Sequence, residues 1–236
     1  MFKLGAMYEN GVGLGEDDVE AVRWYRKAAE AGSLDGTVNL AWMYENGRGV
    51  SKDDWQAVGW YRKAAEAGNV IAMNNLGRMY ADGRDVAKDD GQAVSWYRKF
   101  AEAGEPVAMY SLGVMYATGA GVAKNGPLAM QWAGKAAERG NVDAQVMLGL
   151  GYTGGVEGVL PDYRQAADWL GKASSQGSTR AQVGLGLLYE NGSGVNQDLE
   201  RARALYSQAA QSSDPQIAKL ANERGQQLDS QRNQQS

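Results

Sequence analysis

The chain repeats its own sequence about every 36 residues, and this repeat constrains the fold more than any other feature. A Leu-Gly pair returns in step, with Leu-Ala in one copy, and the last copy comes one residue late. The recurring tyrosines are Tyr8, Tyr44, Tyr80, Tyr116, Tyr152 and Tyr189, and the recurring tryptophans are Trp24, Trp60, Trp96, Trp132 and Trp169. Such a period is typical of solenoids, in which each unit buries its apolar face against its neighbours. This architecture more often forms binding surfaces than active sites.

Within one unit, the apolar residues indicate two helices. Ala72, Leu76 and Tyr80 share one helical face, which predicts a first helix over about 69–81. A glycine is expected to end this helix because glycine readily adopts the left-handed backbone conformation. The glycines at this position are Gly11, Gly47, Gly83, Gly119, Gly155 and Gly192.

The second helix of four of the units is expected to begin at an aspartate. The side chain of Asp53 can accept hydrogen bonds from free backbone amides, and Gln56 three residues later would complete a capping box. Asp17, Asp89 and Asp162 repeat this arrangement. Trp60 and Tyr61 are expected to point inward among small alanines, and Gly68 closes the helix. Each unit is therefore predicted to be a pair of packed helices.

Composition and charge exclude several classes of function. The 236 residues carry 24 Lys and Arg against 28 Asp and Glu, a net charge of −4, so no basic field would attract nucleic acid. No stretch approaches the roughly 20 apolar residues that span a bilayer, which predicts no transmembrane segment. Cysteine and histidine are both absent. Disulfides, thiolate metal sites and the usual activated nucleophiles are therefore excluded.

The N-terminus begins inside a unit. Later copies carry several more residues before their leucine, so we expect that sequence upstream of Met1 is missing. The visible start shows no signal-peptide pattern, which leaves cytoplasmic and exported locations both open. Phe2, Leu4 and Met7 form an apolar half-unit without a cap. Such a face would contact missing sequence or support end-to-end self-association.

The C-terminus differs from the repeats. Asp214 and Pro215 are a favourable start for a cap helix over 214–228. The polar run 229–236 lacks apolar periodicity and is expected to be disordered. The predicted units before the cap helix are 1–32, 33–68, 69–104, 105–140, 141–177 and 178–213.

Three segments carry a family resemblance: Asn-Leu-Gly-Arg-Met-Tyr at 75–80, Gly-Arg-Gly-Val at 47–50, and Trp-Tyr-Arg-Lys-Ala-Ala-Glu-Ala-Gly at 60–68. They resemble Sel-one-like repeats, which are related to tetratricopeptide repeats, and the resemblance extends over about Phe2 to Ser213. The departures are Ala41, Gly36, Gly151 and Ser213. The resemblance implies an all-α, right-handed superhelical solenoid that serves as an adaptor or scaffold, often in bacterial envelopes, secretion or host interaction. The cysteine bridges of one branch are absent, which weakens transfer of that branch's penicillin-related binding.

Patterns that suggest chemistry have a simpler explanation in the repeat. Gly149, Gly151 and Gly154 satisfy the dinucleotide-binding spacing, but they fall in a predicted helix rather than between a strand and a helix. Aspartate pairs recur at helix starts, where they act as caps. An acidic loop lacks calcium-ligand spacing; it contains Asp82, Asp85, Asp89 and Asp90. We therefore expect no catalytic residue, cofactor or metal site, and a carboxylate-dependent hydrolase is the alternative that these carboxylates leave open.

Residues that break the repeat on the binding surface are the candidate site. In related superhelices the first helix of each unit lines the concave groove. There, units two to four carry the partner-binding candidates Asn39, Trp42, Asn74, Asn75, Arg78 and Tyr110. Amides can pair with a peptide backbone, and tryptophan and arginine are favoured anchors. The alternative is that the aromatic residues belong partly to the core and that the asparagines are merely solvated. A further exposed aromatic, Trp55, is interpreted as an accident of packing on the outer face.

The sequence therefore predicts a non-enzymatic scaffold that binds a protein or peptide in this groove. The alternative is an envelope protein associated with cell-wall glycan, in which the same aromatic and amide groups would contact sugars.

Overall fold

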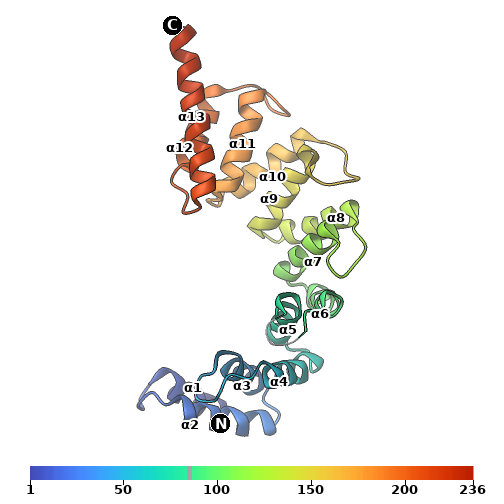
Figure 1. The fold of residues 1–236 in the computed structure, drawn as a ribbon, viewed down its shortest axis with the longest axis vertical. Coiled ribbons are helices and arrows are strands. Elements are labelled where there is room, and N and C mark those ends of the chain that lie inside the picture. The colour runs from blue at the N-terminus through green and yellow to red at the C-terminus, as the bar shows by residue number, and fades with distance from the viewer. Residues whose placement is uncertain (84–86, 236) are drawn as a thin grey trace. The chain divides into compact units, whose positions relative to one another are not determined.

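The computed structural model describes residues 1–83 and 87–235, with side chains described as far as residue 230. Asp85 of the acidic loop lies outside the described residues. All regular secondary structure in the described part is helical, which confirms the predicted all-α fold (Figure 1). The helices are α1 (Phe2–Asn10), α2 (Asp18–Glu30), α3 (Leu34–Asn46), α4 (Asp54–Glu66), α5 (Val70–Asp82), α6 (Asp90–Glu102), α7 (Pro106–Thr118), α8 (Gly126–Glu138), α9 (Val142–Leu150), the π-helical turn η1 (Gly151–Gly155), α10 (Tyr163–Ser175), α11 (Thr179–Asn191), α12 (Leu199–Ala209) and α13 (Pro215–Gln235).

The chain divides into two compact units. The first contains residues 1–108 with 120–122, and the second contains 109–119 with 123–236. In the first unit α3 packs on α4 and α5 packs on α6, while in the second α9 packs on α10 and α11 packs on α12. Each pair is one copy of the sequence repeat, and α13 packs against α12 after the last copy.

The recurring Leu-Gly glycine marks a close contact within a helix pair. A Cβ atom added to Gly5 would lie 2.7 Å from the ring of Tyr25, and one added to Gly186 would lie 2.6 Å from the ring of Tyr206. Both rings are fully buried. In these two copies, the missing side chain lets the two helices approach over an aromatic ring. In these copies, the Leu-Gly glycine of one helix and the buried tyrosine of the other helix therefore form one packing arrangement.

The second helices are capped as expected, but by half a capping box. The Asp53 carboxylate accepts a hydrogen bond from the Gln56 amide at 3.0 Å. The backbone N–H of Asp53 donates to the Tyr44 carbonyl at 2.9 Å instead of to the Gln56 side chain. The same backbone bond joins Asp17 to Tyr8, Asp89 to Tyr80, Asn125 to Tyr116, Asp162 to Tyr152 and Asp198 to Tyr189. This bond fixes the loop between the two helices of every pair.

One glycine prediction is wrong. Gly11, Gly47 and the equivalent residues have positive φ, but Gly155 does not; the residue with positive φ is Gly154, at 101°. In this copy the bond from Asp162 to Tyr152 spans one residue more than in the others. The inserted residue therefore lies between these two positions, where the structure forms the π-helical turn η1, a known consequence of inserting a residue into a helix.

In the structure α13 continues to Gln235, past Leu228, where the cap helix was expected to end. Leu228 is 2% exposed and packs in a cluster with Ala202 and Tyr206 of α12. Asp229 pairs with the Arg203 guanidinium at 2.7 Å. The apolar contact and the ion pair together hold this end of the helix against α12. Within the described residues, no helix combines the length and apolar character needed to cross a membrane.

Candidate partner-binding surface

The six predicted residues lie on the first helices of their pairs. Asn39 and Trp42 are on α3, residues 74, 75 and 78 are on α5, and Tyr110 is on α7. All six side chains are half-buried. The first five belong to the first compact unit and Tyr110 belongs to the second, so the two groups are described separately.

Arg78 and Asn75 take part in a hydrogen-bond network inside the first unit. The Tyr61 hydroxyl donates to Glu45 at 3.0 Å, and the Arg78 guanidinium pairs with the other oxygen of this 9%-exposed carboxylate. Burial raises the pKa of Tyr61, and the charge of Glu45 and the hydrogen bond to it raise it further. The charge of Arg78 and a hydrogen bond with Asn75 act in the opposite direction. These two predicted site residues therefore help to join adjacent repeats.

The same network recurs in the first and last repeats. The Tyr25 hydroxyl donates to Glu9 and also shares a hydrogen bond with Asn39. In the last repeat, Tyr206 donates to Glu190 at 2.6 Å, and the Arg224 guanidinium lies 3.4 Å from that carboxylate. A buried tyrosine, a glutamate of the same repeat and a polar group from the next helix form each network.

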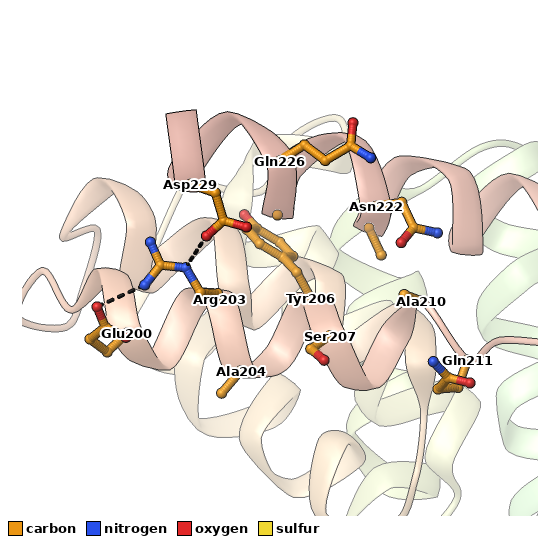
Figure 2. Close-up of a pocket in the computed structure, with 12 residues that line it drawn as sticks. Glu200, Arg203, Ala204, Tyr206, Ser207, Ala210, Gln211, Asn222, Gln226 and Asp229 are labelled. Atoms are coloured by element: carbon orange, nitrogen blue, oxygen red, sulfur yellow. Dashed lines mark hydrogen bonds and ion pairs between the residues drawn. The ribbon is translucent and has the colours of Figure 1, made fainter. Parts of the chain in front are cut away.

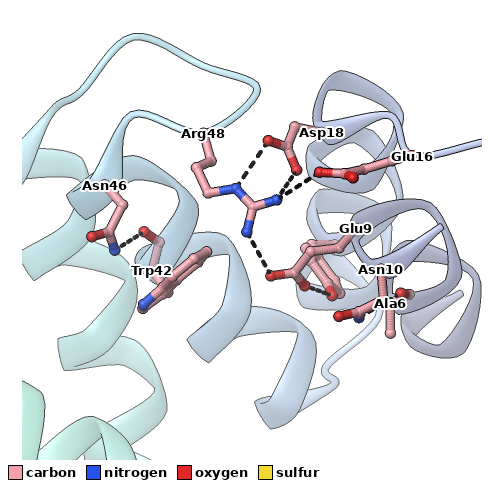
Figure 3. Close-up of polar contacts among 9 residues, drawn as sticks. Ala6, Glu9, Asn10, Glu16, Asp18, Trp42, Asn46 and Arg48 are labelled. Carbon is pink, nitrogen blue, oxygen red and sulfur yellow. Dashed lines mark hydrogen bonds and ion pairs between the residues drawn. The ribbon is translucent and has the colours of Figure 1, made fainter.

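Trp42 supports the contact between the first two repeats. Its ring packs against the first core cluster, which includes Val22 and Leu40. The Arg48 guanidinium lies 5.4 Å from the centre of the ring. Figure 3 shows that this guanidinium also bridges to Asp18, with bonds of 2.9 and 2.7 Å. Sequence reasoning missed Arg48, although its place in the Gly-Arg-Gly-Val loop was a signal. Trp42 keeps only part of its ring available to a partner.

Asn74 differs from the other predicted residues of the first unit in its polar contacts. Within the described part of the chain its half-buried side chain makes no hydrogen bond or ion pair. Its amide is therefore available to a ligand.

In the second unit, Tyr110 lines a pocket of about 330 Å³. Val114, Val146 and Leu150 form apolar walls, and Asp143 and Arg180 also line the pocket. Burial raises the pKa of Tyr110 and the charge of Asp143 adds to this effect, while the charge of Arg180 opposes it. The pocket therefore combines an apolar interior with one charge of each sign.

The sequence explains why this pocket is apolar. At the network positions of Glu45 and Tyr61, the fourth repeat has Ala117 and Ala133. The fifth repeat has Thr153 and Leu170 there. The polar network is therefore replaced by small and apolar groups. This change can be seen by comparing equivalent positions of the repeats in the sequence. The sequence analysis instead favoured the polar candidates of repeats two and three.

A second pocket of about 520 Å³ lies between α12 and α13 (Figure 2). Its charged groups are engaged with each other, because Arg203 pairs with both Glu200 and Asp229, each at 2.7 Å. Small residues line much of the remaining surface. This pocket is the seam where the terminal helix packs on the last repeat.

The described residues contain no group of His, Cys, Asp or Glu side chains placed to hold a metal ion. Gly149 lies in α9 and Gly151 and Gly154 lie in η1, so these glycines do not form a phosphate-binding turn between a strand and a helix. Asp17, Asp53 and Asp89 cap helices.

Comparisons with known proteins agree with this repeat fold. The model of the Sel1 repeat matches residues 1–33, 35–69, 70–105, 106–141, 142–178 and 179–214. The structure is similar to that of c5321, described as a protective antigen present in uropathogenic Escherichia coli strains and displaying an SLR fold, with a TM-score of 0.86 and 33% identity over 96% of this chain. This chain spans 51% of the length of c5321. It is also similar to a Sel1 repeat protein from Oxalobacter formigenes, with a TM-score of 0.72 and 37% identity over 88% of this chain and 84% of that one. No curated protein sequence matches the chain.

Proposed function

Because the chain belongs to the Sel1 repeat family, we propose that it is a non-enzymatic scaffold that binds a peptide or partner protein through the first helices of its repeats. Sel1 repeat proteins are generally protein-interaction scaffolds. The similarity to c5321, described as a protective antigen, supports a role in the bacterial envelope, in secretion or in host interaction.

The pocket around Tyr110 is the observation that carries this proposal. Leu150 is 37% exposed beside the pocket interior. An apolar cavity beside a tyrosine is the kind of site that takes an anchor side chain of a partner. Asp143 and Arg180 supply one acceptor group and one donor group that can fix the orientation of the bound segment.

In the first unit, the proposed surface consists of Asn39, Trp42, Asn74, Asn75 and Arg78. Asn75 and Arg78 hold the network with Tyr61 and Glu45, and both side chains are only half-buried. Asn74 would supply both a donor and an acceptor to a partner backbone.

The test compares three variants in quantitative binding to partners captured by the wild-type protein. Tyr110→Ala combined with Leu150→Ala should weaken binding by about 2 kcal/mol, because anchor residues dominate interface energies. The matched control is Leu160→Ala, which removes an 87%-exposed leucine of the same unit outside the pocket. In the first unit, Asn74→Ala tests the surface without disturbing the internal network.

Unchanged partner affinity in folded Tyr110/Leu150 and Asn74 variants would show that the first-helix surface is not the binding site. If Leu160→Ala weakened binding as much as the Tyr110/Leu150 variant, the loss would reflect a general effect of removing apolar side chains and not a binding role of the pocket.

A further inference from the structure

Trp55 is a large exposed side chain that the fold does not require. It lies in the first turn of α4 and is 70% exposed. The equivalent residues in the first, third and fourth repeats are Val19, Gly91 and Pro127. An exposed tryptophan costs solubility, so its presence beside a cavity indicates a binding role more than a packing role. Trp55 lines a pocket of about 330 Å³ in the first unit.

Gly59, one turn after Trp55, also lines this pocket and has no side chain to fill it. Glycine inside a helix is unfavourable relative to alanine. Packing does not demand it here, because an added Cβ would have no atom within 4 Å. The equivalent residue in the first repeat is Arg23, and in the fourth it is Gln131. A bulky residue at position 55 and a missing side chain at position 59 together create space beside an aromatic face.

The pocket lining carries two cations, Arg62 and Lys88, and one carboxylate, Asp89. The Arg62 guanidinium donates to the Tyr80 hydroxyl at 2.5 Å and forms no ion pair among the described residues. The carboxylate of Asp89 accepts a hydrogen bond from the backbone N–H of Gln92 and so caps the helix. Lys88 is paired with Asp90 at 3.3 Å. Among the residues that the structure describes, Arg62 is therefore the lining cation that no carboxylate pairs with.

We propose that this pocket, lined by Trp55, Val58, Gly59, Arg62 and Tyr80, binds an apolar or aromatic side chain of an acidic partner segment, with a neighbouring carboxylate at Arg62. Val58 and the Trp55 ring receive the apolar group, and the guanidinium offers a charge-assisted hydrogen bond to the carboxylate. This site is separate in sequence and in repeat position from the Tyr110 pocket.

The test uses the full chain and two probe peptides, acetyl-Gly-Asp-Phe-Asp-Gly-amide and its neutral counterpart with Asn in place of both Asp. Binding is followed by the NMR signal of the Trp55 indole N–H, assigned from its loss in Trp55→Phe. The acidic peptide should shift this signal saturably and should bind about fivefold more tightly than the neutral peptide, as expected for one charge-assisted contact.

Two variants separate the charge from the cavity. Arg62→Gln should lower the affinity for the acidic peptide to that of the neutral peptide, and should leave the affinity for the neutral peptide unchanged. Gly59→Leu fills the pocket where the backbone has free space, so it should remain folded and should abolish binding of both peptides. Ile71→Ala is the matched control, because Ile71 is a 56%-exposed apolar residue of the same unit outside the pocket.

Equal affinity of the acidic peptide for wild type and for folded Gly59→Leu would overturn the proposal. So would a Trp55 shift caused by cellohexaose when both peptides leave the signal unchanged, since that result would make the pocket a glycan site. Equal effects of Ile71→Ala and Gly59→Leu would also count against it.

Discussion

At the scale of single residues, the recurring Trp-Tyr-Arg-Lys segment has a separate role for each side chain. In the second repeat Tyr61 is buried and donates to Glu45, while Arg62 reaches the next repeat at Tyr80. The Lys63 ammonium lies 5.2 Å from the centre of the half-buried Trp60 ring. Trp60 therefore does not point fully inward, as its spacing had suggested. The Trp60 ring packs at the edge of the core with the Lys63 ammonium over its face. This cation–π contact favours both the ring and the ammonium.

The Tyr61 hydroxyl is expected to stabilise the fold in a pH-dependent way. Tyr61→Phe should lower the free energy of unfolding by about 1–2 kcal/mol at neutral pH, because a buried oxygen of Glu45 loses its donor. The folded-state pKa of Tyr61 is raised above its ordinary value of 10.0, chiefly by burial. Its proton is retained in the folded state while the unfolded state loses it, so stability should fall as pH rises above 10. Denaturant unfolding between pH 8 and 11 should show a shallower alkaline loss in Tyr61→Phe than in wild type. An identical alkaline slope in both proteins would contradict this role.

At the scale of elements, the sequence predicted the helices and caps that recur from repeat to repeat. It missed features that occur in one copy only. Helix identity and the aspartate caps followed from recurring spacing and were confirmed. The turn at Gly154 was missed because it depends on one inserted residue. The sequence analysis ended the cap helix at Leu228, and composition does not show the contacts that Leu228 and Asp229 make with α12. The internal use of Asn75 and Arg78 was missed for the same reason, because their partners lie in the preceding repeat.

The packing of α13 can be tested at two leucines of the same helix. Leu228→Ala should cost about 2–3 kcal/mol of stability, because Leu228 is 2% exposed and its removal leaves a cavity beside α12. Leu220→Ala should cost well under 1 kcal/mol, because Leu220 is 42% exposed. Denaturant unfolding measures both. Equal costs at the two positions would mean that the end of α13 is not packed as described.

At the scale of the whole molecule, the six repeats should transmit destabilisation only over a short range. In a repeat protein each copy contacts its neighbours, so stability is close to a sum of local terms. Leu40→Ala removes a fully buried side chain from the core cluster shared by the first repeats. It should speed amide hydrogen exchange in α1 to α4 and leave exchange in α11 to α13 close to wild type. Leu228→Ala should produce the reverse pattern. Hydrogen exchange followed by mass spectrometry measures both variants segment by segment.

If either variant lowered protection equally along the chain, unfolding would be globally cooperative, and a partner bound at one repeat could then stabilise all of the repeats. The local pattern would instead let the Trp55 and Tyr110 pockets bind ligands without mutual effect, because occupancy of one would not change the stability of the other.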